Sequence, residues 1–370
     1  MGLLRTLFAL AVAVGHMGNM WGLEPMNGDV AVESFYIVSG FYMTMIYNEK
    51  YAAFANARRV FWLSRYLRLA PAYLLIILLT YLTLGPGLLA DLAPPDLVLA
   101  LASQILLVGQ DLVSFLGLDT ATGTLFFVRN FHALPANGGN VFAGPILLVP
   151  QGWTLGVEAW FYLLVPLIVT RRPGTILAVL ASSLGLHIAG FYLLGLKGDP
   201  WTYRFFPFEL AVFLMGALAY HGLRRLRASS ASTRSAPWIL AAIAILALCY
   251  HYLPGGNAER KWIFLVILAA ALPLIFELTK DTAWDRLIGD FSYPIYIAHG
   301  LCFALLARWD SPILNDRTWG GPVKLALMLA FAFLIVMVAE RPSDRFRHRL
   351  ARRIARVPAG AAGLAAAAGS

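Results

Sequence analysis

An arginine and a histidine stand eleven positions apart in the apolar stretch RTLFALAVAVGH. Eleven helical steps of about 100° leave a net rotation near 20°, so Arg5 and His16 share one helix face, roughly 16 Å apart along the axis. That face could hold a long ligand with its anionic head at Arg5 and its reactive end at His16, because neutral imidazole is a base near pH 7. The alternatives are a cytoplasmic anchor for Arg5 and a packed, hydrogen-bonded ring for His16.

Two further motifs carry charge at the ends of apolar stretches. Arg65 and Arg68 in RYLRLAP share a helix face, and paired guanidiniums suit phosphate groups; lipid anchoring and topology are the alternatives. Glu158 in QGWTLGVEAWFYLLVP lies inside an apolar segment and needs a partner. His16 is a candidate partner, because the two residues are expected at a similar depth in the membrane. A carboxylate beside the imidazole would fix its tautomer. A structural pair of Glu158 with arginine or tyrosine is the alternative.

Other polar residues divide between packing and chemistry. Glu33 precedes the segment FYIVSGF, in which Ser39 and Gly40 favour close helix packing. Glu209 is interpreted as structural, paired with Arg204. No P-loop, H-E-x-x-H or G-x-S-x-G motif is present, so no metal site is expected.

Ser292, Tyr296 and His299 in SYPIYIAHG fall nearly on one helix face. Aromatic and histidine side chains near a membrane boundary are often interfacial belt residues, which is the alternative to a functional site.

The elements that must position these residues are membrane-spanning helices. The chain has 370 residues, of which 59% are hydrophobic and 13% are charged, whereas soluble domains carry about 25% charged residues. The net charge of +9 comes from short Lys and Arg clusters between apolar segments, so the positive-inside rule explains it better than nucleic-acid binding does. We expect an all-α polytopic transmembrane helix bundle.

Eleven segments approach the length that a bilayer crossing needs, about 20 residues. They are residues 3–20, 31–48, 67–84, 96–116, 152–170, 174–196, 205–223, 237–253, 262–279, 288–308 and 322–340.

Loop charge gives the orientation. The loops after 31–48, 152–170 and 205–223 are rich in Lys and Arg and should be cytoplasmic, whereas WGLEPMNGD and GPGLLADLAPPD carry neither residue and should face outward. A full crossing by 96–116 would break this order. We therefore expect ten full crossings with both termini cytoplasmic, and a segment 96–116 that is partial or re-entrant, or that pairs with a weak second crossing near 124–134.

The chain is expected to form one membrane domain, residues 1–342, followed by a basic and then low-complexity cytoplasmic tail, residues 343–370. The last part of this tail, VPAGAAGLAAAAGS, is expected to be disordered.

Six motifs in this order resemble acyltransferase family 3, the integral membrane O-acyltransferases that include O-antigen and exopolysaccharide acetylases. Arg5 and His16 match the family's Arg-x10-His, FYIVSGF resembles FFVLSGF, and RYLRLAP resembles Arg-x-x-Arg-x-x-Pro. WTLGVEAWFYLLVP resembles WSLSVEEQFYLLWP, SYPIYIAHG resembles SYSLYLWH, and AERP resembles EKP. The chain departs from the family at Ala159, which replaces the second Glu of the VEE pair, and at its start, MGLLR, which lacks Leu-Asp-Gly.

The resemblance implies transfer of an acyl group, often acetyl, from cytoplasmic acyl-CoA to a hydroxyl of an extracytoplasmic envelope glycan or glycolipid, such as lipopolysaccharide. It also implies a multi-pass protein of the bacterial inner membrane, with His16 as the essential catalytic residue. We expect His16 to act as general base or acyl carrier, Glu158 to orient it, and Arg5, Arg65 and Arg68 to bind the acyl-CoA. The candidate contacts to the acceptor substrate are Glu33, Trp153, Tyr296 and His299.

Two other classes fit parts of the pattern. A transporter or flippase for a polar lipid-linked solute would also place charges inside the membrane, but inverted repeats are not evident. A non-catalytic scaffold would not need clustered His, Arg and Glu. The oligomeric state stays open, with a homo-oligomer compatible with the sequence.

Overall fold

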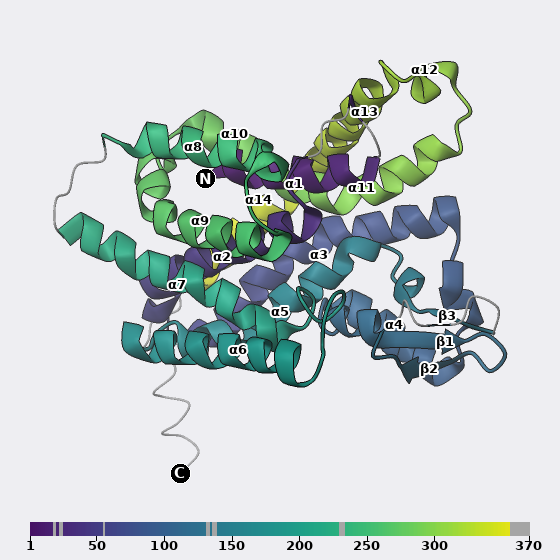
Figure 1. Ribbon diagram of the computed structural model, residues 1–370, viewed down its shortest axis with the longest axis horizontal. Helices are drawn as coiled ribbons and strands as arrows, with labels where there is room; N and C mark the ends of the chain where they lie inside the picture. Colours follow the sequence, from purple (N-terminus) through teal and green to yellow (C-terminus); the bar gives the residue numbers. More distant parts are fainter. Residues whose placement is uncertain are drawn as a thin grey trace, which may run out of the picture.

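The computed structural model describes residues 1–17, 20–21, 25–54, 56–130, 134, 139–228 and 234–355. Most of the described chain is helical (Figure 1). The helices in chain order are α1 (Gly2–Met17), α2 (Gly28–Glu49), α3 (Ala57–Leu84), α4 (Pro94–Leu106), α5 (Trp153–Ile168), α6 (Pro173–Leu193), α7 (Phe206–Ala228), α8 (Ala236–Leu248), α9 (Asn257–Thr279), α10 (Ala283–Asp290), α11 (Ser292–Ala307), α12 (Pro312–Asn315), α13 (Gly320–Ile335) and α14 (Arg341–Ala355).

Each of the eleven predicted apolar segments overlaps a helix. Within the described residues, seven helical stretches are long and apolar enough to cross a membrane, and α1, α4 and α8 are shorter apolar helices. This supports a multi-pass helical membrane protein. The number of crossings and the side of each terminus stay predictions.

The segment 96–116 forms one short helix and then changes structure. Helix α4 has 13 residues and is therefore about 20 Å long, short of the ~30 Å core of a bilayer. The alternative of a second crossing near 124–134 is not supported, because residues 124–127 form a strand. Residues 131–133 and 135–138 lie outside the described part of the chain.

A small antiparallel sheet modifies the all-α expectation. Strands β1 (Leu116–Asp119), β2 (Thr124–Phe127) and β3 (Asn140–Phe142) pair in the order β2-β1-β3, beside α4 (Figure 1). The turn between β1 and β2 is stabilised by Asp119, whose Oδ1 accepts a hydrogen bond from the Ala121 amide at 2.9 Å. Gly123 then takes a positive φ of 70°. The sheet lies between α4 and α5, a region in which the sequence predicts no strand.

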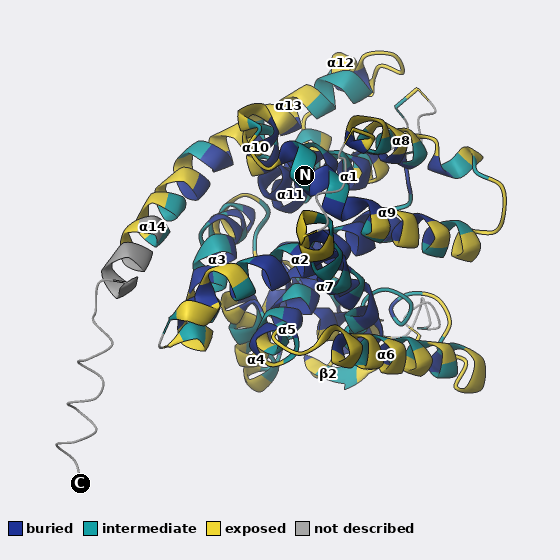
Figure 2. Ribbon diagram, turned by 90° about the vertical axis from the view of Figure 1, so that its left-hand side faces the viewer, coloured by how far each residue is buried: buried dark blue, intermediate teal, exposed yellow. Residues whose placement is uncertain are grey.

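Helix α2 forms the centre of the bundle. It packs directly on α7, where a Cβ added to Gly40 would lie 1.9 Å from the Phe213 carbonyl oxygen, and one added to Gly216 would lie 1.9 Å from that of Ile37. Only glycine allows this approach of two helix backbones. In Figure 2, α2 and α7 are largely buried, while α6 and α13 carry many exposed residues on the outside. Apolar side chains exposed on α13, such as Leu334, suit contact with lipid.

The π-helical segment Val336–Glu340 joins α13 to α14 without a break. Helix α14 lies against α3, and the Ser343 hydroxyl donates to the Leu67 carbonyl at 2.7 Å. The helix therefore crosses the predicted boundary between residues 342 and 343, although the division into two domains stays a prediction. The low-complexity end of the tail, residues 356–370, lies outside the described residues.

Candidate active site

A cavity of about 230 Å³ lies between α2, α3, α5 and α11 and the start of α1. One face of α2 runs along it, because the lining residues recur every three or four positions. This face consists of Val32, Phe35, Tyr36, Ser39, Tyr42, Met43 and Ile46, and the neighbouring Val38 also lines the cavity. The fourteen steps from Val32 to Ile46 cover about 21 Å of helix axis. The cavity is thus long enough to hold an extended ligand.

The three arginines expected to bind a donor all line this cavity, so the structure brings together residues from α1 and α3. They differ in their partners. Arg68 is ion-paired with Glu340. Arg65 contacts the Ser64 hydroxyl at 3.3 Å and the Met43 sulfur at 3.7 Å.

Neither Arg5 nor Arg65 has a carboxylate partner among the described residues. The Nε of Arg65 is also buried without a hydrogen-bond acceptor there. A buried cationic donor without a partner is costly, so this end of the cavity suits an anionic ligand group.

Glu158 lines the same cavity but does not pair with His16, which corrects the sequence-based expectation. Its Oε1 accepts a hydrogen bond from the Ser39 hydroxyl at 2.5 Å, and Tyr162 is a second hydrogen-bond partner. The three side chains form a polar group along an otherwise largely apolar wall. Ser39, interpreted from the sequence as a packing residue, therefore belongs to the cavity.

His16 lies at the end of α1, where its side chain is exposed and is not part of the cavity lining. Its Nδ1 is 2.8 Å from the Val12 carbonyl oxygen. Because a carbonyl only accepts, Nδ1 carries the hydrogen and the Nε2 lone pair is available to take a proton. The backbone of α1 thus has the orienting role that the sequence assigned to Glu158.

His299 is the side chain that the structure places against His16. The ring centroids are 5.1 Å apart, and the buried His299 has its Nδ1 3.3 Å from the Ile295 carbonyl oxygen. Tyr296 connects this histidine pair to the cavity, since it lines the cavity and its ring centroid is 6.0 Å from that of His299. Tyr296 and His299 are therefore brought to the same place, as the motif SYPIYIAHG predicts.

Glu33 is engaged elsewhere. It is fully buried, and its Oε1 accepts a hydrogen bond from Lys261 Nζ at 2.7 Å. Asp29 is 3.8 Å from the same ammonium group. Glu209 is also fully buried, and its carboxylate is close enough to interact electrostatically with Glu33, Asp29 and Lys261. This cluster lies between α2, α7 and α9 and outside the cavity lining, so contact between Glu33 and a substrate is not favoured.

Trp153 and Arg204 form a separate contact. The Arg204 guanidinium lies 4.3 Å from the Trp153 ring centroid and pairs with Asp199 at 2.6 Å. The expected pairing of Arg204 with Glu209 is therefore wrong. Trp153 is mostly buried under this arginine and does not line the cavity.

Sequence reasoning missed two parts of this arrangement. The stripe of cavity residues on α2 has a signal, because its polar members Ser39 and Tyr42 recur at helical spacing within an apolar segment. Lys261 has no such signal in the sequence. It stands beside a charged loop and therefore resembles a residue that only sets the orientation of the helix in the membrane. Among the described residues, no group of three or more His, Cys, Asp or Glu side chains could hold a metal ion.

Comparison with known proteins identifies the family of the chain. A family model described as an acyltransferase domain matches residues 1–341. The O-acetyltransferase OatA of Staphylococcus aureus (strain NCTC 8325 / PS 47) is 24% identical over 52% of this chain and 29% of its own length. A protein of S. aureus (strain COL) named "Putative O-acetyltransferase SACOL0978" is 20% identical over 92% of this chain and 56% of its own length.

An uncharacterized protein of Aquifex aeolicus (strain VF5) is 24% identical over 56% of this chain and 93% of its own length. The matches thus span less than a third of OatA and about half of the second staphylococcal protein. No solved structure matches the chain. Because the family model covers more than nine-tenths of the sequence, the chain belongs to the membrane acyltransferase family that its motifs resemble, and it is an acyltransferase.

Proposed function

We propose that the protein transfers an acyl group, most simply acetyl, from cytoplasmic acyl-CoA to a hydroxyl of an extracytoplasmic glycan or glycolipid in the bacterial inner membrane. The observation that carries the proposal is the cavity with incompletely neutralised arginines at one end and Tyr296, next to the histidine pair, at the other. The names of the staphylococcal relatives support acetyl as the group that is transferred.

The donor would enter with its nucleotide at the arginine end. Arg5 and Arg65 offer unpaired guanidiniums to its phosphates, and Arg68 adds charge beside them. The pantetheine arm would then follow the face of α2 past Ser39, Glu158 and Tyr162. Pantetheine contains amide groups, and a hydroxyl with a carboxylate offers them both donor and acceptor atoms. We assign Glu158 to donor positioning on this ground.

His16 would act on the acceptor. Its Nε2 takes the proton of the acceptor hydroxyl, while the oxygen attacks the thioester carbonyl. The tetrahedral intermediate collapses, the carbon–sulfur bond breaks, and the coenzyme thiolate takes the proton from His16. The products are the O-acyl ester and the free thiol. An acyl-histidine intermediate is the alternative route through the same nitrogen.

The test uses full-length protein in lipid nanodiscs with labelled acetyl-CoA and a panel of envelope glycans and glycolipids. We expect transfer by the wild type and a loss of about 10²–10⁴-fold in kcat for His16→Ala, the usual contribution of general acid–base catalysis. His187→Ala is the matched control, because His187 packs against Phe208 outside the cavity.

Normal activity of folded His16→Ala protein would remove the proposed mechanism. Absence of transfer from any acyl-CoA, together with movement of a lipid-linked glycan across vesicles, would favour a flippase instead.

A further inference from the structure

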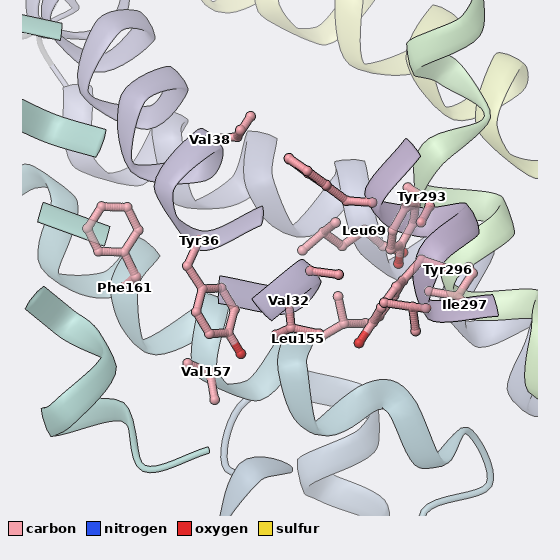
Figure 3. Packing of buried hydrophobic residues seen from close by; sticks show 14 of the residues in the cluster. Val32, Tyr36, Val38, Leu69, Leu155, Val157, Phe161, Tyr293, Tyr296 and Ile297 are labelled. Atoms are coloured by element: carbon pink, nitrogen blue, oxygen red, sulfur yellow. The ribbon is translucent and has the colours of Figure 1, made fainter. Parts of the chain in front are cut away.

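The end of the cavity opposite the arginines carries mainly aromatic and aliphatic side chains. It is lined by Val32, Phe35, Tyr36, Leu155 and Tyr296, with Thr154 as a polar neighbour. Figure 3 shows Tyr36 and Tyr296 on either side of Val32 and Leu155. A long apolar ligand group directed away from the arginines would meet this surface.

Two rings form what we call the end wall, Phe35 of α2 and Tyr296 of α11. Their centroids are 5.9 Å apart at an interplanar angle of 64°, an edge-to-face contact. Phe8 of α1 supports Phe35 from behind with a second edge contact at 5.9 Å. The wall and its support therefore come from three helices.

Hydrogen bonds hold Tyr296 in place. Its hydroxyl is bonded to Thr154, whose own hydroxyl donates to the Gln151 carbonyl at 2.9 Å. The Gln151 side-chain amide in turn donates to the carbonyls of Tyr296 at 3.3 Å and Ile297 at 2.8 Å. Rotation of the phenol would break its hydrogen bond to Thr154, and the Gln151 bonds fix the backbone that carries the ring, so the wall resists displacement by a ligand.

We propose that the end wall selects the length of the acyl group. This inference rests on the proposed acyl-CoA donor, whose acyl group is the part farthest from the nucleotide phosphates. With the phosphates at the arginines, the acyl chain points at Phe35 and Tyr296, and each added methylene must displace a packed ring. Such overpacking costs about 1–3 kcal/mol, and one methylene in a pocket changes discrimination by about 10- to 200-fold. The cavity therefore accepts acetyl and similarly short groups.

Removing one ring of the wall tests this directly. We compare kcat/KM for acetyl-CoA, butyryl-CoA and hexanoyl-CoA with wild-type protein and Phe35→Ala in nanodiscs. The wild type should prefer acetyl over hexanoyl by at least about tenfold, and Phe35→Ala should raise the hexanoyl-to-acetyl ratio by at least about tenfold.

Phe41→Ala is the matched control. Phe41 is an aromatic residue of the same helix, but it faces Tyr220 and Phe276 rather than the cavity. The hexanoyl-to-acetyl ratio of kcat/KM for Phe41→Ala should equal that of the wild type.

A second variant and a binding measurement keep the test decisive if Phe35→Ala fails to fold or loses activity. Phe35→Leu removes less volume and should shift the ratio in the same direction by a smaller factor. The affinity for non-hydrolysable hexanoyl and acetyl thioether analogues of CoA, measured by calorimetry, should move in parallel. An unchanged ratio of affinities in both Phe35 variants would overturn the inference. Absence of acyl transfer from every donor by the wild type would contradict the proposed function instead.

Discussion

Arg65 and Lys261 are both cations within membrane-embedded helices, yet their surroundings are opposite. Lys261 is enclosed between helices and makes a 2.7 Å bond to the fully buried Glu33. Arg65 borders an open cavity, with a hydroxyl and a thioether as its polar contacts. The charge of Lys261 is thus paired with a carboxylate of the protein, whereas that of Arg65 has no carboxylate partner among the described residues.

The difference shows that a charge inside a membrane helix does not by itself mark a binding site. Ionisable residues there are costly and are usually taken as functional, but a cation with a buried carboxylate can equally hold helices together. The distinguishing property is the partner. For this reason Arg65 remains a candidate for ligand binding, whereas Glu33 and Lys261 are better explained as a contact between α2 and α9.

The largest effect that we expect is a loss of stability when Lys261 is replaced. Lys261→Met leaves Glu33 as an uncompensated buried charge, which costs about 3–5 kcal/mol in comparable cases. We expect a large loss of stability, measured by thermal unfolding of the protein in detergent. The double variant Glu33→Gln/Lys261→Met removes both charges and should recover more than half of that loss. Unchanged stability with lost activity in Lys261→Met would mean that this cluster is functional.

The next effect separates the two arginines of α3. Arg65→Ala should raise KM for acetyl-CoA by about 10- to 100-fold, because a hydrogen bond to a charged group contributes about 1.5–3 kcal/mol. Stability should change little, since no carboxylate loses a partner. Arg68→Ala should raise KM and also lower the unfolding temperature, because Glu340 is left unpaired.

S-acetylpantetheine provides the control for this prediction, because it lacks the nucleotide phosphates. Its KM should be the same with wild-type and Arg65→Ala protein. Equal loss with both donors would show that Arg65 does not act through phosphate.

The smallest effect is expected at Glu158. Glu158→Gln keeps an oxygen that accepts the hydrogen bond from Ser39, so the change should be about 0.5–1.5 kcal/mol and should appear in KM for the donor. If Glu158 instead oriented His16, kcat would fall by about 10²-fold or more. Steady-state kinetics that resolve kcat from KM decide between these outcomes.

The sequence predicts the helices well, because long apolar segments leave few alternatives in a bilayer. All eleven predicted segments overlap helices. It does not predict the sheet of residues 116–142, whose strands are only three or four residues long and carry little periodic signal. The shortness of α4 has a signal in the sequence, because Gln104, Gln110 and Asp111 interrupt the apolar segment 96–116.

For the candidate site, spacing along one helix was informative and pairing between helices was not. Arg65 and Arg68 are on the predicted face, and both line the cavity. The partner of Glu158 was predicted from depth alone, but depth does not determine rotation about the helix axis. Ser39 is the partner because the cavity face of α2 is turned towards α5.

The unbroken helix from Gly320 to Ala355 links the lipid phase to the donor end of the cavity. Most side chains of its apolar part are exposed or half-buried, while Glu340 and Ser343 attach its far end to Arg68 and Leu67 of α3. A bilayer that is too thin or too thick for this helix makes it tilt, and the tilt would pull on the turn that carries both guanidiniums. If the proposed acyl-CoA donor binds at these arginines, hydrophobic mismatch would reach its site, and the length of the surrounding lipid tails would change the donor affinity.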